Sequence, residues 1–311
     1  MLYITTRNNK DAFTAPRTLQ QDLAPDGGLY VPFHLPAFSE SEKEEFRKKS
    51  FGETVSHILN LFFSSRLNGW DVDFCIGRNP FKFSQLNHKT VVAELWHNPD
   101  GEMDYVVQSL YHRVYPESFD KATEWFCLAV RIAVLFALYG ELLRQNLMTD
   151  ADLLDAVVPG DDLSACAAVN FAKSMGLPVK TVICGCSEGT AVLELLRRGT
   201  FNTKCPEGTE GTERLIHSCL NSAEALRFAE ACSNGESYSI GEDAVAALNR
   251  SVFTAAVSRD RIRSVVHSTQ QTNHYPVNEK TALALAGLQD YRTNTGENRI
   301  ALVLMDKKPT A

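Results

Sequence analysis

The chain has 311 residues, of which 44% are hydrophobic and 22% are charged. That balance is enough for one large or two ordinary globular domains and excludes a wholly disordered chain. With 31 basic and 38 acidic side chains the net charge is −7, which argues against nucleic-acid binding and against docking on an anionic membrane.

The eight cysteines are dispersed, and the sequence does not open with a basic segment followed by an apolar one. We therefore expect reduced thiols in a cytoplasmic protein. Cys184 and Cys186 are close in sequence, but no second pair of ligands accompanies them at a suitable spacing. No metal site is predicted there.

The first ninety residues predict a small, mostly helical unit after an irregular, strand-like start. The start contains a turn over 25–28, Pro-Asp-Gly-Gly, in which Pro fixes φ and Gly accepts a positive φ. Ser39 followed by Glu42 has the pattern of a capping box. One apolar helix face is expected from the spacing of Phe51, Val55, Ile58, Leu59 and Phe62.

The run 126–143 is apolar enough to be mistaken for a membrane span. It contains Arg131 and Glu141, and a charge near the centre of a span costs about 2.5–3.5 kcal/mol. We therefore predict a buried core helix over 125–145.

From residue 150 onward, short apolar segments alternate with helical patterns. Thr149 with Asp152 is expected to cap a short helix, and 207–213 is an acidic repeat expected to be a solvated loop. The strands are expected at 156–158, 179–184 and 299–305. The helices are expected at 163–175, 190–198, 259–272 and 279–291. Strands that alternate with helices predict an α/β fold with a parallel sheet flanked by helices.

Several stretches occur in an order that is typical of one family. They are 3–7 with 23–32, Glu94-Leu95-Trp96-His97 with Pro99, 158–160 with 172–178, Glu213-Arg214-Leu215, and Thr281-Ala282. They resemble the opening signature, the segment before the cofactor lysine, the phosphate loop with its helix, and later segments of threonine synthase. That family consists of pyridoxal-phosphate (PLP) enzymes of fold type II.

The resemblance implies a particular division of the chain. Residues 1–92 would be the threonine synthase-like N-terminal unit. Residues 93–311 would be a shortened large domain like that of tryptophan synthase β. Most of the small cofactor domain, including the loop that would hold the substrate carboxylate, would be deleted between 104 and 160.

The residue at the position of the family's cofactor lysine is different here. Counting from His97, that position holds Asp104. A carboxylate cannot form a Schiff base. Its charge would also lie near the cofactor's anionic oxygen, where two like charges at 4 Å repel by about 4 kcal/mol at an effective dielectric of 20.

The other cofactor contacts depart from the family as well. The phosphate loop reads Gly160-Asp161-Asp162-Leu163-Ser164, and an Asp at a helix N-cap satisfies the N–H groups that would bind an anion. The carboxylates would repel a phosphate. In 304–309 the hydroxyl that would pair with the pyridine nitrogen is absent.

We therefore expect a threonine synthase-like pseudoenzyme of amino-acid metabolism, a binding or regulatory paralogue that has lost PLP. No catalytic residue and no metal is predicted. The loss of a domain would expose an apolar face, so a homodimer or a complex with a catalytic paralogue is expected. The degenerate cofactor pocket is expected to comprise His97, Asp104, Gly160, Asp161, Asp162 and Ser164.

Two alternatives stay open. An active threonine synthase or PLP-dependent lyase could use another lysine; by resemblance Lys280 is nearer the pocket, whereas Lys173 and Lys180 are expected to be solvated. A divalent metal or small molecule could instead bind an acidic cluster. The candidate cluster residues are His97, Asp100, Glu102 and Asp104, or Asp161 and Asp162.

Overall fold

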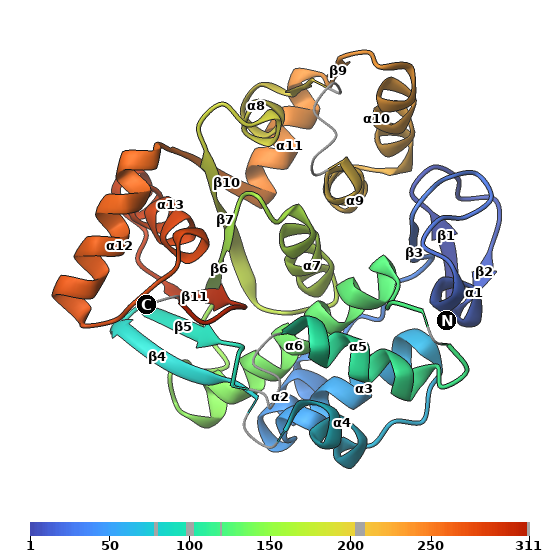
Figure 1. Cartoon of the computed structure of the whole chain (residues 1–311), viewed down its shortest axis with the longest axis horizontal. Helices are drawn as coiled ribbons and strands as arrows, with labels where there is room; N and C mark the ends of the chain where they lie inside the picture. The colour runs from blue at the N-terminus through green and yellow to red at the C-terminus, as the bar shows by residue number, and fades with distance from the viewer. Residues whose placement is uncertain (78–79, 98–102, 119, 203–208, 310–311) are drawn as a thin grey trace. The chain divides into compact units, whose positions relative to one another are not determined.

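The computed structural model describes residues 1–77, 80–97, 103–118, 120–202 and 209–309 (Figure 1). Its contacts divide the chain into two units. The first unit comprises 1–81, 95–152 and 171–178, and the second comprises 82–94, 153–170 and 179–311. The division expected at residues 92 and 93 concerned correspondence with the family, and it stays a prediction.

The first unit combines a three-stranded antiparallel sheet, in the order β2-β1-β3, with several helices (Figure 1). Its strands are β1 (Leu2–Thr5), β2 (Phe13–Thr14) and β3 (Tyr30–Pro32). Its helices are α1 (Ala15–Gln20), α2 (Glu40–Lys48), α3 (Phe51–Phe63), α4 (Gly69–Ile76), α5 (Met103–Val114) and α6 (Glu124–Arg144).

Helix α6 is a buried core helix, as predicted, and it lies in the first unit. Within the described part of the chain it is the single helix long and apolar enough to cross a membrane, yet 83% of its most apolar window is buried in the protein. Helices α2 and α3 pack against it. The backbone of α2 comes so close that a Cβ on Gly140 would lie 3.0 Å from the carbonyl carbon of Phe46.

Local capping signals explain where these helices begin. Ser39 and Glu42 form the predicted capping box of α2, and Gly27 takes a positive φ of 73° in the predicted turn. Thr149 and Asp152 make the expected cap hydrogen bond, with the Thr149 N–H 2.8 Å from Asp152 Oδ2, but no helix follows. That prediction was wrong because β6 begins at Leu154 and leaves room only for a turn.

The second unit is built on a six-stranded sheet in the order β10-β7-β6-β11-β5-β4. All neighbouring pairs are parallel except β4–β5, an antiparallel hairpin. The α/β prediction is confirmed, and β4 is an addition that the sequence did not reveal. The strands are β4 (Lys82–Asn87), β5 (Thr90–Glu94), β6 (Leu154–Pro159), β7 (Val179–Ser187), β10 (Val252–Val257) and β11 (Ile300–Met305).

Helices flank this sheet, and a two-stranded sheet lies beside them (Figure 1). The two strands are β8 (Thr200–Phe201) and β9 (Tyr238–Ser239). The helices are α7 (Leu163–Ser174), α8 (Ala191–Arg198), α9 (Thr209–Cys219), α10 (Ser222–Asn234), α11 (Glu242–Ser251), α12 (Arg259–Asn273) and α13 (Glu279–Thr295). The last residues of α7 are grouped with the first unit.

The acidic repeat is not a solvated loop where the structure describes it. Residues 207 and 208 lie outside the described residues, but α9 begins at Thr209, and Glu213 is only 3% exposed. The composition of this segment is typical of a loop, but the segment is helical because α9 packs against the start of α7. A Cβ on Gly211 would lie 3.1 Å from Leu163 Cβ.

Helix α13 lies directly on β7 through two glycines. A Cβ on Gly287 would lie 2.8 Å from Gly185 Cα, and a Cβ on Gly185 would overlap the carbonyl oxygen of Leu283. Two glycines at one contact allow the backbones of a helix and a strand to approach closely.

We expect Gly185→Ala to lower the free energy of unfolding by about 1–3 kcal/mol, because overpacking a close backbone contact forces the helix away. Urea unfolding followed by circular dichroism measures this. Gly241→Ala is the control, since φ there is −71° and no atom lies within 4 Å of the added Cβ. An equal loss in both variants would contradict the role of the contact.

Candidate functional site

The carboxyl ends of the parallel strands meet at one edge of the second unit's sheet. There β7 borders β6 on one side and β11 borders it on the other. In open parallel sheets ligands bind beyond the carboxyl ends of the strands, at the point where the strand order reverses. The loop after β6 and the first turn of α7 lie at this point. They contain four of the predicted site residues, Gly160, Asp161, Asp162 and Ser164.

Gly160 is fixed against β7. Its N–H donates to the carbonyl oxygen of Gly185 at 2.6 Å. A Cβ at this position would lie 2.7 Å from the same oxygen and would overlap the sulfur of Cys186. Only glycine therefore allows the loop to leave β6 along this path.

Asp162 caps α7, as the sequence predicted. Its Oδ1 accepts the N–H of Ala165 at 3.0 Å, and its carbonyl oxygen accepts the same N–H at 3.1 Å. A carboxylate is also favoured at this end of a helix by the helix dipole. One N–H group of the α7 terminus is thus satisfied within the protein.

Asp161 does not cap the helix but faces a cation from α13. Its Oδ2 lies 3.4 Å from Nζ of Lys280, and both side chains are substantially exposed. Exposed ion pairs contribute about 0–1 kcal/mol to stability, so this pair matters more for local charge than for folding.

Ser164 is half-buried in the first turn of α7. Helix α9 passes close to it, because a Cβ on Gly211 would lie 3.2 Å from the Ser164 nitrogen. The prediction that Ser164 belongs to a degenerate cofactor pocket stays a prediction.

Three buried thiols lie behind the loop. The sulfur of Cys184 is 3.6 Å from that of Cys166 on α7 and 3.7 Å from that of Cys186. The hydrogen bond from Cys166 and burial raise the pKa of Cys184 well above the usual range, and the hydrogen bond with Cys184 and burial do the same for Cys186. Cys184 and Cys186 are therefore neutral thiols at physiological pH and are not nucleophiles.

His97 and Asp104 belong to the first unit. Asp104 is exposed in the first turn of α5, and His97 is exposed with its ring stacked on Trp96 at 5.4 Å between centroids. The proposed cluster partners Asp100 and Glu102 lie outside the described residues. Among the residues that are described, no group of three or more His, Cys, Asp or Glu is arranged to hold a metal ion.

A buried carboxylate at the sheet edge was not recognised as a site residue from the sequence. Glu94 ends β5 and is 4% exposed; it accepts hydrogen bonds from Tyr275 at 2.7 Å and from Ser84. Burial and the bond to Glu94 raise the pKa of Tyr275. Tyr275 therefore stays a protonated donor and ties the α12–α13 link to the β4–β5 hairpin.

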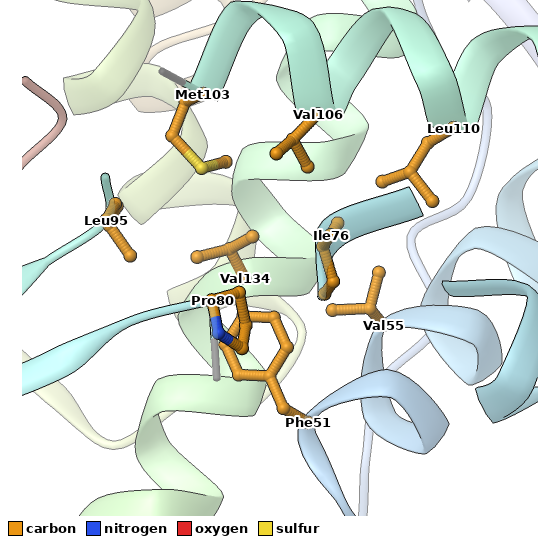
Figure 2. Close-up of a pocket in the computed structure, with 9 residues that line it drawn as sticks. All are labelled: Phe51, Val55, Ile76, Pro80, Leu95, Met103, Val106, Leu110 and Val134. Atoms are coloured by element: carbon orange, nitrogen blue, oxygen red, sulfur yellow. The ribbon is translucent and has the colours of Figure 1, made fainter. Parts of the chain in front are cut away.

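The first unit contains an apolar hollow, shown in Figure 2. Side chains from α3 to α6 line it together with Pro80 and Leu95, and none of the nine is polar. Its cavity volume is about 10 Å³, which is about one water molecule. It therefore offers no group for catalysis and no space for a substrate.

Comparisons with known proteins agree with this architecture. Residues 2–79 match the family model described as threonine synthase N terminus. Threonine synthase-like 1 of Mus musculus is 23% identical over 183 residues, which are 58% of this chain and 23% of that protein. Threonine synthase of Pseudomonas aeruginosa is 29% identical over 119 residues, which are 35% of this chain and 25% of that protein.

The fold is shared with solved threonine synthases. The PLP-bound enzyme from Brucella melitensis superposes with a TM-score of 0.82 at 15% identity, covering 99% of this chain and 89% of that one. The yeast enzyme gives 0.81 at 14% identity, covering 99% and 87%. The chain therefore has the fold of solved threonine synthases, and its residues 2–79 match the N-terminal model of that family. It spans about a quarter of the length of the curated relatives it matches.

The group expected in such a fold is PLP, whose phosphate would need N–H groups and positive charge. In this chain the loop after β6 offers instead the carboxylates of Asp161 and Asp162. The Asp162 oxygen already uses the Ala165 N–H, and Lys280 is already paired. This set of donors does not fit a phosphate.

Sequence reasoning found the loop but missed its surroundings. The Lys280 partner, the Cys186 contact and the Glu94–Tyr275 bond join segments that are far apart along the chain. Only the position of Lys280 had been indicated, through the resemblance of 279–282 to a family segment.

We expect Asp162→Ala to destabilise the protein by about 1 kcal/mol through loss of the α7 cap, whereas Asp162→Asn should be nearly neutral because Asn caps as well as Asp. Thermal unfolding of the two variants at neutral pH gives the comparison. Equal destabilisation by both would mean that the charge, and not the cap, is what stabilises the helix.

Proposed function

We propose that this protein is a threonine synthase-like pseudoenzyme that has lost PLP-dependent catalysis and acts in the cytoplasm as a binding or regulatory paralogue. The observation that supports the proposal is the loop after β6, where Asp161 and Asp162 stand at the position that resembles the family's phosphate loop.

Electrostatics explain why this loop would reject the cofactor. A phosphate carries about −1.5 to −2 charges at pH 7. Two like unit charges 4 Å apart repel each other by up to about 4 kcal/mol at an effective dielectric of 20, and by less where water screens the pair. Asp161 is exposed, so its contribution lies below this limit. The cap at Asp162 is half-buried and screened less.

Asp104 supports the same proposal. By resemblance it stands at the lysine position, and it is exposed in the first turn of α5. A carboxylate there has no amine to offer to an aldehyde. Asp104 belongs to the first unit and the loop after β6 to the second, so the missing amine and the altered phosphate loop are independent changes.

The alternative of an active enzyme requires another lysine. Lys280 is the candidate nearest to the loop, but its Nζ lies 3.4 Å from the Asp161 carboxylate. A side chain held in this ion pair has to leave Asp161 before it can attack an aldehyde. Metal or small-molecule binding at the acidic residues is a further proposal that has less support.

Association is also part of the proposal, as a homodimer or with a catalytic paralogue. Two aromatic side chains on α4 support it, because Trp70 is 76% exposed and Phe74 is 85% exposed. They are four residues apart and therefore lie on the same face of the helix. Aromatic residues in such positions are typical of interfaces.

Purified protein titrated with PLP should show no saturable absorbance band near 410–430 nm, and borohydride reduction should label only scattered surface lysines. Lys280→Arg, which keeps the charge but cannot form a Schiff base, is the control. A single labelled lysine that disappears in this variant would establish the active-enzyme alternative.

Trp70→Ser combined with Phe74→Ser should convert the associated protein into a monomer while shifting the melting temperature by less than about 3 °C. Light scattering after size-exclusion chromatography measures the mass. Tyr105→Ser on α5, another exposed aromatic, is the control. A wild-type protein that is monodisperse and monomeric at high concentration would contradict association.

A further inference from the structure

The two carboxylates of the loop after β6 have different tasks. Asp162 is engaged by the backbone, since its Oδ1 accepts the N–H of Ala165 at 3.0 Å. Asp161 is engaged by a side chain, since its Oδ2 lies 3.4 Å from Nζ of Lys280. The Asp162 carboxylate caps the helix, whereas the Asp161 carboxylate forms a contact that a competing anion could break.

We propose that the Asp161 carboxylate is the resident anion of this loop, held there by Lys280, and that this pair keeps phosphate-bearing ligands out. The inference rests on the proposed function, in which the loop takes no cofactor phosphate. It adds which residue excludes the phosphate and which cation that residue neutralises.

Three features of the structure support this assignment. Lys280 stands in the first turn of α13, whose position against β7 is fixed by the Gly185–Gly287 contact. The loop is fixed against the same strand, because the Gly160 N–H donates to the Gly185 oxygen. Both side chains reach solvent, so an ion from solution can compete with Asp161 for Lys280.

The pair also defines the class of ligand at this edge of the sheet. An incoming phosphate would have to displace Asp161 from Lys280 and then remain close to the displaced carboxylate. A neutral or cationic ligand meets no such barrier. The ligands of the wild-type loop are therefore expected to lack a phosphate group.

The test is the binding of inorganic phosphate, measured by isothermal titration calorimetry at constant ionic strength. Asp161→Asn removes the resident charge and releases Lys280, so we expect phosphate to bind at least tenfold more tightly than to wild type. Asp161→Asn combined with Lys280→Met should lose this gain, because the cation is then absent.

Asp162→Asn is the matched control. It removes the same charge one residue away, keeps an N-cap side chain and leaves the Asp161–Lys280 pair in place, so a much smaller gain in phosphate affinity is expected than for Asp161→Asn. Thermal unfolding of each variant confirms that it is folded, and Asp161→Gly serves as a second probe of the same position.

Two results would overturn the inference. If Asp161→Asn and Asp161→Gly bind phosphate no better than wild type, the pair is not what excludes anions. If Asp162→Asn gains as much as Asp161→Asn, net charge alone is responsible. Either result leaves the proposed function standing as long as wild type forms no PLP adduct, whereas a specific wild-type adduct would defeat that function by itself.

Discussion

The second unit depends on the close approach of three backbone segments at Gly185. Strand β7 accepts a hydrogen bond there from the loop after β6, and α13 lies directly against it through Gly287. Side chains at these glycines would separate the layers by more than a core can absorb. The contact therefore sets both the path of the loop and the position of α13.

The contact at Gly185 also determines which charges meet at the carboxyl edge of the sheet. Because α13 and the loop are both fixed against β7, Lys280 at the start of the helix comes within 3.4 Å of Asp161. Asp162 meanwhile satisfies part of the α7 terminus. An edge that in many parallel sheets receives an anionic ligand is here supplied with the protein's own negative charges.

Fold and chemistry depend on different residues in this protein. The architecture is close enough to solved threonine synthases to give a TM-score of 0.82, although only 15% of the residues are identical. The sheet order and the glycine contacts serve packing, whereas the loop residues serve chemistry, and the two sets can change independently. The shared fold therefore carries less information about activity than the two carboxylates of the loop do.

The sequence by itself determined the features that arise from local chemistry. The Ser39–Glu42 box, the buried helix around Arg131 and the cap at Asp162 were all predicted, because each depends on residues within a few positions of one another. The α/β class followed from the alternation of apolar strands with helices. The family resemblance identified the loop as a candidate site.

Tertiary structure alone decided the rest. The acidic composition around Glu213 indicated a loop, but packing of α9 made it helical and buried, and the Thr149–Asp152 cap had no room for a helix. The Asp161–Lys280 and Glu94–Tyr275 contacts join segments that only the fold brings together. Local patterns encode hydrogen bonds along the chain, whereas contacts across the fold depend on how closely whole elements can pack.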